Sequence, residues 1–276
     1  MNKKNPEISV VMPAYNAEKY IARAIESVLN QTFSNFELII VNDASTDKTL
    51  SIIKRYAKKD SRIRYKSNLK NKLIAHSLNT AIEMAKAPII ARMDGDDEST
   101  PERLATQFAI LKKNKKIAVV GANLTVVDTK GNVVSKREYP KQSKDLKRLM
   151  FRYSPFSHPV VMFRKSVFDE FHGYRTDIFP CEDIDLWFKI GSKYDFASVE
   201  KPLLKYTLTP NSSSHKKLKK LELLTFRIRL NAVKNLHYRP SVYDIFYNIG
   251  QFVTLWFVTP KMRIALYDLL RKHELI

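Results

Sequence analysis

Cysteine and glycine are scarce in this chain of 276 residues. Cys181 is the one cysteine, which excludes an intramolecular disulfide and a zinc site built from several thiolates, and which fits a reducing compartment. The chain has six glycines, and it contains neither a G-x-G-x-x-G fingerprint nor a P-loop. A glycine-rich backbone therefore does not cradle phosphates here, and dinucleotide-binding proteins and P-loop NTPases are excluded.

The chain also lacks a long apolar run. The N-terminal residues 1–6 contain no apolar segment of the kind found in a secretory signal peptide, so we expect a cytoplasmic protein. The stretch 245–259 has 15 residues without charge, but it holds Asn248 and Gln251 and is shorter than the about 20 residues that a spanning helix needs. This stretch is expected to lie in a membrane interface; the alternative is a helical cap packed on the rest of the protein.

Negative charge is in short supply as well, with 28 Asp and Glu against 48 Lys and Arg, a formal net charge of +20. Nucleic acid, anionic lipid and phosphorylated substrates could all offset such a charge. Residues 211–276 hold 12 Lys and Arg and 4 Asp and Glu, a net +8, and the basic residues there alternate with apolar ones. This pattern favours an anionic membrane surface over nucleic acid as the partner.

Strand-like and helix-like segments alternate through the first hundred residues. Asn16 is expected to cap the first helix, Leu73 to face inward from the third, and Thr100 with Pro101 to open the helix after the fourth strand. Strands alternating with helices indicate an α/β fold with a mostly parallel, Rossmann-like sheet covered on both faces. The predicted strands cover residues 8–12, 36–41, 63–66 and 88–93, and later 117–121, 124–127, 133–134 and 158–163.

Polar clusters follow three of these strands, at Pro13–Asn16, Asn42–Asp47 and Asp94–Glu98. Ligands of parallel sheets bind beyond the carboxyl ends of the strands, so the three clusters are expected to meet in one site. The third packs four carboxylates into five residues, which repel one another unless a cation offsets their charge. A divalent metal held by Asp94 and Asp96 is the predicted remedy, and a solvated acidic turn is the alternative.

Several segments together resemble family 2 glycosyltransferases of the GT-A fold. The resemblance spans about residues 7–208 and implies a GT-A catalytic domain over 1–210, followed by a basic, partly apolar helical region over 211–276. The segments that carry it are Ile8–Asn16, Val28–Thr32, Phe36–Asp47, Ala91–Asp97, Gly173–Tyr174 and Glu182–Trp187.

The resemblance implies an inverting hexosyl- or N-acetylhexosaminyl-transferase of polysaccharide biosynthesis. It would move a sugar from a nucleotide sugar, most often a UDP-sugar, to a glycan or lipid-linked acceptor, with Asp183 as the general base. Asp94 and Asp96 would hold Mn²⁺ or Mg²⁺ on the diphosphate, which stabilises the leaving group without proton transfer. The residues implied to bind nucleotide or substrate are Pro13, Ala14, Tyr15, Asn16, Asp43, Ser45, Arg92, Asp94 and Glu182.

Other interpretations stay open from the residues alone. Asp183 could simply cap its helix. The acidic cluster could belong to a metal-dependent phosphatase or nucleotidyltransferase, or the chain could be a non-catalytic basic glycan-binding protein. We expect His158 and Trp187 to be structural. The segment Tyr206–Thr209 lacks the histidine that many family members carry there, and His215 is an open substitute.

Overall fold

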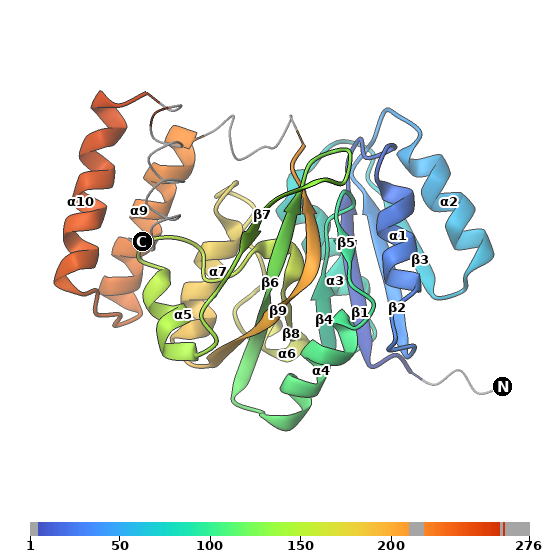
Figure 1. The fold of residues 1–276 in the computed structure, drawn as a ribbon, viewed down its shortest axis with the longest axis horizontal. Coiled ribbons are helices and arrows are strands. Elements are labelled where there is room, and N and C mark those ends of the chain that lie inside the picture. Colours follow the sequence, from blue (N-terminus) through green and yellow to red (C-terminus); the bar gives the residue numbers. More distant parts are fainter. Residues whose placement is uncertain (1–4, 210–217, 260–261, 263–276) are drawn as a thin grey trace.

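The computed structural model describes residues 5–209, 218–259 and 262, and its central feature is a nine-stranded sheet (Figure 1). The spatial order of the strands is β3-β2-β1-β4-β8-β6-β9-β5, and β7 pairs with β6 beside this path. The strands are β1 (Ile8–Ala14), β2 (Phe36–Asn42), β3 (Ile63–Ser67), β4 (Ile89–Arg92), β5 (Glu98–Ser99), β6 (Ile117–Val127), β7 (Val133–Arg137), β8 (Met162–Arg164) and β9 (Asp195–Thr207).

Helices cover both faces of the sheet, as the sequence predicts. Val10 and Met12 of β1 pack in one core with α1, α2 and α4, whereas Val11 packs in a second core with α3, α6, α7 and α9. This alternation follows from the period of two along a strand. The helices are α1 (Ile21–Leu29), α2 (Thr49–Lys59), α3 (Leu73–Met84), α4 (Arg103–Lys113), α5 (Ser143–Leu149), the 3₁₀ turn η1 (His158–Val160), α6 (Lys165–Glu170), α7 (Glu182–Gly191), α9 (Leu218–Asn235) and α10 (Val242–Phe257).

The first four strands run parallel. β1 lies between β2 and β4, with Ile8 opposite both Phe36 and Ile89, and β3 pairs with the far side of β2. The carboxyl ends of β1, β2 and β4 therefore reach the same edge of the sheet. The polar clusters that follow these strands start from that edge, which is the arrangement expected from the sequence.

The second half of the sheet is mixed. β8 runs antiparallel to both β4 and β6, and β6 is parallel to the long strand β9. The prediction of separate strands at 117–121 and 124–127 is wrong, because β6 continues through both and its register against β9 shifts at Asn123. The predicted hairpin after β6 is confirmed: Asp128 Oδ1 accepts from the backbone N–H groups of Lys130 and Asn132.

Two predicted helix starts are also wrong. Asn16 has φ +49° and lies outside α1, and its Oδ1 accepts from Thr46 N at 2.9 Å, so it joins two loops instead of capping a helix. Thr100 and Pro101 form a turn ahead of α4, in which Arg103 N donates to Thr100 O at 3.1 Å. A tertiary hydrogen bond keeps Asn16 out of the helix, and a turn keeps Thr100 and Pro101 out, although all three are common residues at a helix start.

Two further local expectations are corrected. Residues 158–160 form the turn η1 and not a strand, because Pro159 has no N–H to give to a ladder, and only Met162–Arg164 pair with the sheet. Leu73 opens α3 with its side chain 43% exposed, so it does not belong to the inward face.

The C-terminal helices pack on the sheet domain. Ile228 and Ala232 of α9 are buried in the same core as Phe188 of α7, and Tyr238 Oη donates to Phe188 O at 3.1 Å. α10 packs against α9 (Figure 1). The predicted helical C-terminal region is confirmed over the described part, whereas the predicted boundary at 210 borders residues 210–217, which lie outside it. Among the described residues, no helix combines the length and apolar character needed to cross a bilayer.

Candidate active site

A cleft of about 2770 Å³ opens at the carboxyl ends of β1, β2 and β4. The structure brings ten of the eleven predicted site residues into its lining. Ser45 is the exception. Its Oγ accepts from Asn16 N at 3.0 Å, so Ser45 contacts the loop after β1 that lines the cleft. The predicted residues that line the cleft are Pro13, Ala14, Tyr15, Asn16, Asp43, Arg92, Asp94, Asp96, Glu182 and Asp183.

Asp43 lies at the end of β2 and is almost fully buried. Its Oδ1 accepts from Asn68 Nδ2 at 2.7 Å and from Lys72 N at 2.9 Å, which fixes the carboxylate against the loop before α3. A second asparagine helps to shape this loop, since Asn71 Oδ1 accepts from Leu73 N at 3.1 Å. On the other side, Tyr15 stands 52% exposed at the wall of the cleft.

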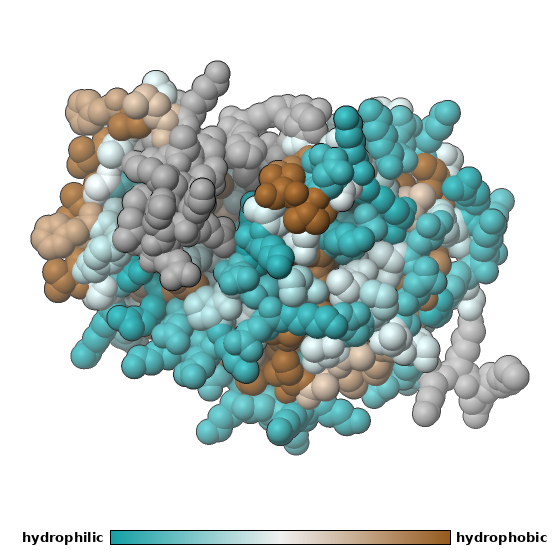
Figure 2. Space-filling view, viewed as in Figure 1, coloured by the Kyte–Doolittle hydropathy of each residue, from teal (hydrophilic) through white to brown (hydrophobic). Residues whose placement is uncertain are grey.

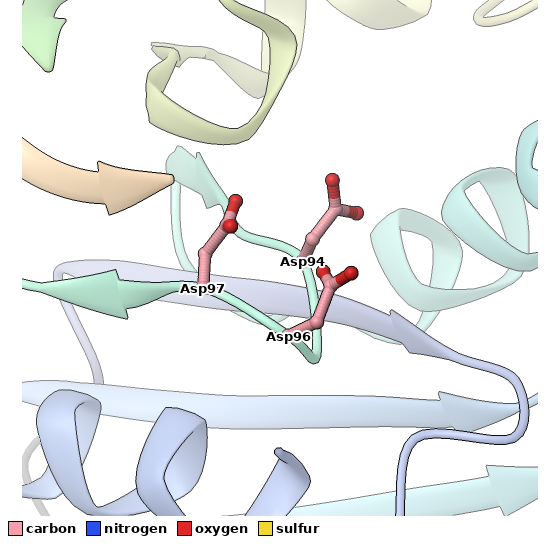
Figure 3. A group of neighbouring side chains, drawn as sticks. All are labelled: Asp94, Asp96 and Asp97. Carbon is pink, nitrogen blue, oxygen red and sulfur yellow. The ribbon is translucent and has the colours of Figure 1, made fainter. Parts of the chain in front are cut away.

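Three carboxylates meet in the loop after β4. Asp94, Asp96 and Asp97 each offer an oxygen, and the three oxygens lie within 4.8 Å of one another. In Figure 3 the three side chains leave the loop on the same side. Burial and the charge of Asp94 raise the pKa of Asp96 to about 7, and burial with Asp96 raises the pKa of Asp97 well above its usual range.

These features fit a hard divalent cation. Asp97 Oδ1 accepts from Thr207 N at 2.9 Å, whereas its buried Oδ2 has no hydrogen-bond partner among the described residues. Closely spaced carboxylates that are hard to ionise gain most from a bound Mg²⁺ or Mn²⁺, which takes oxygen ligands. The metal site predicted from the sequence includes Asp94 and Asp96 but not Asp97, although the D-x-D-D run places a third carboxylate beside them.

Arg92 is the buried cation beside this cluster. It is 1% exposed, and its Nη1 donates to Asp94 Oδ2 at 2.7 Å. Burial disfavours the charge, but Asp94 and then Tyr174 outweigh it and hold the pKa of Arg92 above its ordinary value. Arg103 is a buried neighbour of Arg92, and its Nη2 donates to Arg92 O at 2.6 Å. Burial lowers the pKa of Arg103 to about 9.

Glu182 and Asp183 begin α7 on the opposite side of the cleft. Burial and then Asp183 raise the pKa of Glu182 to about 7, and its buried Oε2 has no hydrogen-bond partner among the described residues. Burial also raises the pKa of Asp183, whose Oδ1 accepts from Ile184 N at 2.8 Å. Cys181 occupies the N-cap position, so Asp183 is not the cap of this helix.

His158 and Trp187 pack together beside the cleft, and His158 is part of its lining. Trp187 is fully buried in the core, and His158 packs edge-on against it with ring centroids 6.1 Å apart. His158 Nε2 lies 2.9 Å from Tyr174 Oη, and burial holds the pKa of the imidazole well below its usual range. Tyr174 is fixed in turn by Asn79, which exchanges two hydrogen bonds with its backbone.

Two residues beside the acidic cluster, Arg23 and Thr207, were not predicted from the sequence to belong to the site. Arg23 Nη2 donates to Thr207 Oγ1 at 2.8 Å and to Asp96 O at 3.3 Å, which ties α1 to the end of β9. Thr207 stands in the segment that lacks the family histidine. His215, the open substitute, lies outside the described residues. No local pattern marks Arg23, because its partners are more than seventy residues away.

α9 and α10 form a further wall of the cleft, which the sequence did not indicate. Arg229 Nη1 donates to Asn248 Oδ1 at 2.9 Å, and Asn248 Nδ2 donates to Phe151 O at 2.8 Å, so the two helices are joined to the turn after α5. The wall residues on these helices are Leu221, Glu222, Thr225, Phe226, Arg229, Tyr247, Asn248, Gln251, Phe252 and Leu255.

The family model described as "Glycosyl transferase family 2" matches residues 9–171, more than half of the chain. The chain belongs to glycosyl transferase family 2. Among its relatives in this family, EpsE of Bacillus subtilis (strain 168), named as a glycosyltransferase, is 42% identical over 67% of this chain and 66% of EpsE. The O-antigen biosynthesis glycosyltransferase WbnJ of Escherichia coli is 33% identical over 76% of this chain and 87% of WbnJ. The chain is therefore a glycosyltransferase.

Solved glycosyltransferase structures share the fold. TarS 1-349 of S. aureus in complex with UDP superposes with a TM-score of 0.69 at 19% identity, over 94% of this chain and 75% of that one. The mannosyltransferase PcManGT of Pyrobaculum calidifontis, in complex with GDP-Man and Mn²⁺, superposes with a TM-score of 0.62 at 18% identity, over 91% and 70%. These likenesses confirm the predicted GT-A fold of family 2.

Proposed function

We propose that this family 2 enzyme transfers a sugar, with inversion, from a nucleotide sugar to a hydroxyl of a glycan or lipid-linked acceptor. The observation that carries this is the pairing of two acidic groups in one cleft. The loop after β4 supplies Asp94, Asp96 and Asp97, and the start of α7 supplies Glu182 and Asp183. Single displacement needs charge stabilisation at the leaving group on one side and a base at the acceptor on the other.

The donor would lie against the ends of β1 and β2. Asp43, held by Asn68 and Lys72, is placed to accept hydrogen bonds from the nucleobase, and Tyr15 offers an exposed ring beside it. Asn16 and Ser45 fix the loop that faces the ribose. The UDP complex of the structurally similar TarS supports UDP as the nucleotide, and a hexose or N-acetylhexosamine as the sugar is part of the same proposal.

The diphosphate would be held at the acidic cluster. Asp94 and Asp96, with Asp97 behind them, would bind Mn²⁺ or Mg²⁺, as Mn²⁺ accompanies GDP-Man in PcManGT. The metal supplies positive charge to the departing diphosphate. Arg92 orients Asp94, because its buried guanidinium donates to that carboxylate at 2.7 Å.

The acceptor would be activated at α7. Asp183 takes the proton of the acceptor hydroxyl as the new bond forms, and its raised pKa makes it a stronger base than an exposed aspartate. Glu182 Oε2, buried in the wall of the cleft without a partner among the described residues, would hydrogen-bond an acceptor hydroxyl. The O-antigen role in the name of WbnJ supports a polysaccharide as the product.

Calorimetry and a transfer assay test these roles. Wild-type protein should bind UDP only weakly without Mn²⁺, and Asp96→Ala should lose the metal-dependent part of the binding. Asp183→Asn should keep UDP binding but transfer sugar roughly 10³-fold more slowly. Asp177→Asn, an exposed acid ahead of α7, is the matched control and should behave as wild type.

The rival functions give different outcomes in the same experiments. A phosphatase or nucleotidyltransferase would release phosphate or exchange the nucleotide without forming a glycosidic bond. A glycan-binding protein without activity would show no metal-dependent nucleotide binding. Near-normal transfer by both Asp96→Ala and Asp183→Asn would overturn the mechanism. The cytoplasmic location at the inner face of the cell membrane is also part of this proposal.

A further inference from the structure

Most apolar residues of α10 face away from the protein. A helix at the surface of a globular protein normally turns its apolar side inward and its polar side outward. On α10 the side turned toward the protein carries the polar residues Asp244, Asn248 and Gln251 beside Tyr247 and Leu255, and Asp244 is 2% exposed. The opposite side, which we name the outer face of α10, consists of apolar residues. These are Val242, Ile245, Phe246, Ile249, Val253, Trp256 and Phe257.

This outer face is well exposed. The side chains of Phe246, Trp256 and Phe257 are 68%, 57% and 83% exposed. Figure 2 shows hydrophobic side chains along the border of the molecule where α10 lies in Figure 1. A contiguous apolar patch of this kind on a soluble domain marks a surface that another body covers.

The polar contacts of the inner side explain why α10 does not rotate about its own axis to bury its apolar residues. Asp244 caps its own helix with Ser241 and forms an ion pair with Arg152 at 2.7 Å. Asn248 bonds Arg229 and Phe151 O. Since these contacts fix the rotation of α10, its apolar residues point outward as a consequence of the fold.

The charges around the outer face are positive. Residues 218–259 contain six Lys and Arg and two Asp and Glu, and one of the two acids is the buried Asp244. Lys219 Nζ lies 4.1 Å from the centre of the Trp256 ring, and the exposed residues Lys220 and Arg227 follow on α9. An exposed apolar face with a tryptophan in contact with a lysine, on a helix pair with a net positive charge, has the features of a helix that lies in the interface of an anionic bilayer.

We infer that the outer face of α10 docks on an anionic lipid bilayer, with the helix lying along the membrane surface. α10 has 16 residues and does not span a bilayer, so interfacial docking is the geometry open to it. A second copy of the chain would meet the same cations on its own surface, and this repulsion disfavours a dimer through this face. The docking does not depend on the catalytic roles proposed above.

Vesicle co-sedimentation tests the docking. Full-length wild-type protein should sediment with vesicles containing phosphatidylglycerol, and at least about tenfold less with pure phosphatidylcholine vesicles. High salt should weaken the binding because it screens the charges. The double variant Phe246→Asp/Ile249→Asp should bind phosphatidylglycerol vesicles at least about tenfold more weakly, because two side chains that enter the bilayer are lost.

A matched control separates docking from a general effect of new charge. Leu69→Asp changes a fully exposed apolar residue in the loop that follows β3, an edge strand on the opposite side of Figure 1 from α10, and should bind vesicles as the wild type does. Asp183→Asn should also bind normally, so failure of catalysis and failure of docking are distinguishable. Circular dichroism establishes that the double variant is folded.

Two outcomes would overturn the inference. One is wild-type protein that binds neither kind of vesicle. The other is a concentration-dependent dimer, seen by analytical ultracentrifugation, that the double variant abolishes; a second copy of the chain would then be the occupant of the outer face.

Discussion

Each carboxylate of the cleft has its own means of remaining in a low-polarity site. Asp43 is held by two N–H donors, Asp94 by the Arg92 guanidinium, and Asp183 by the backbone N–H of Ile184. These contacts do not offset all of the charge, because burial raises the pKa values of Asp96, Asp97, Glu182 and Asp183. At the scale of residues, the site therefore has an excess of negative charge that the buried Arg92 partly balances through its ion pair with Asp94.

Removal of that arginine should make stability depend on metal. Arg92→Leu leaves Asp94 and its neighbours without their buried cation, so we expect a loss of about 3–5 kcal/mol in the free energy of unfolding. Mn²⁺ should recover a larger part of this loss than the metal adds to the wild type, because it restores positive charge to the cluster. Urea titrations with and without Mn²⁺ measure both effects.

Arg64→Leu provides the control for this variant. It removes an arginine from a 2.8 Å pair with Glu37, a buried carboxylate far from the acidic cluster in sequence and outside the cleft lining. Mn²⁺ should stabilise Arg64→Leu no more than the wild type. Equal recovery by Mn²⁺ in both variants would contradict the role given to Arg92.

At the scale of elements, the segment that connects α6 to α7 leads to Asp183, the base proposed above. The chain reverses at His172 and Gly173, both with positive φ, and Tyr174 follows. Asn79 of α3 holds the backbone of Tyr174, and His158 of η1 lies against its hydroxyl. The segment that leads to α7 is therefore held by contacts with α3 and η1, two elements that come earlier in the chain.

Gly173→Ala should disturb this connection. Gly173 has φ +71°, and an added Cβ would lie 2.9 Å from the Phe168 ring, so strain and overlap should cost about 2–3 kcal/mol of stability. Gly131→Ala is a matched control with φ +89° and nothing within 4 Å of its Cβ, and should cost only about 1 kcal/mol. Thermal unfolding compares the two, and equal losses would mean that the packing against Phe168 is unimportant.

At the scale of the whole molecule, the buried acids of the cleft link stability to pH. Burial raises the pKa of Asp96 from 3.8 and of Glu182 from 4.5, each to about 7. The folded state therefore binds more protons than the unfolded state between about pH 4 and 7, and stability falls as pH rises through this window. Transfer should follow the opposite trend, because Asp183 must be ionised to act as a base.

Urea unfolding at pH 5 and pH 8 without metal, beside transfer rates at the same pH values, tests these opposite trends. Glu182→Gln should lose less stability between the two pH values than the wild type, since its side chain no longer titrates. Asp177→Asn should match the wild type. A wild type that is more stable at pH 8 than at pH 5 would show that the burial of these acids is offset elsewhere.

The sequence predicted the parts of the site that lie at strand ends. Asp43 and Asp94 follow buried apolar runs, and parallel pairing places such ends together. Arg23 and Thr207 escaped because their contacts join positions 184 residues apart, which no local pattern encodes. Asn16 was misassigned to a helix cap because its tertiary partner, Thr46, outweighed its local preference.

The sequence also did not predict that α9 and α10 form a wall of the cleft, because this wall depends on contacts between distant residues. The apolar and polar residues of 242–257 predict an amphipathic helix from the sequence, but only its contacts with Arg152 and Arg229 determine which side faces inward. In the structure Phe246 is 68% exposed, whereas Asn248 is hydrogen-bonded to Arg229 and to Phe151 O.

α10 stands between the cleft and the outer face. One side of it lines the cleft and the other side is the outer face, so the helix itself separates the two by its own diameter of about 10 Å. With the outer face in a bilayer, an acceptor anchored to lipid would have to rise past that thickness to enter the cleft. The width of the helix would then set a minimum distance, about one helix diameter, between the membrane and the first sugar that can react.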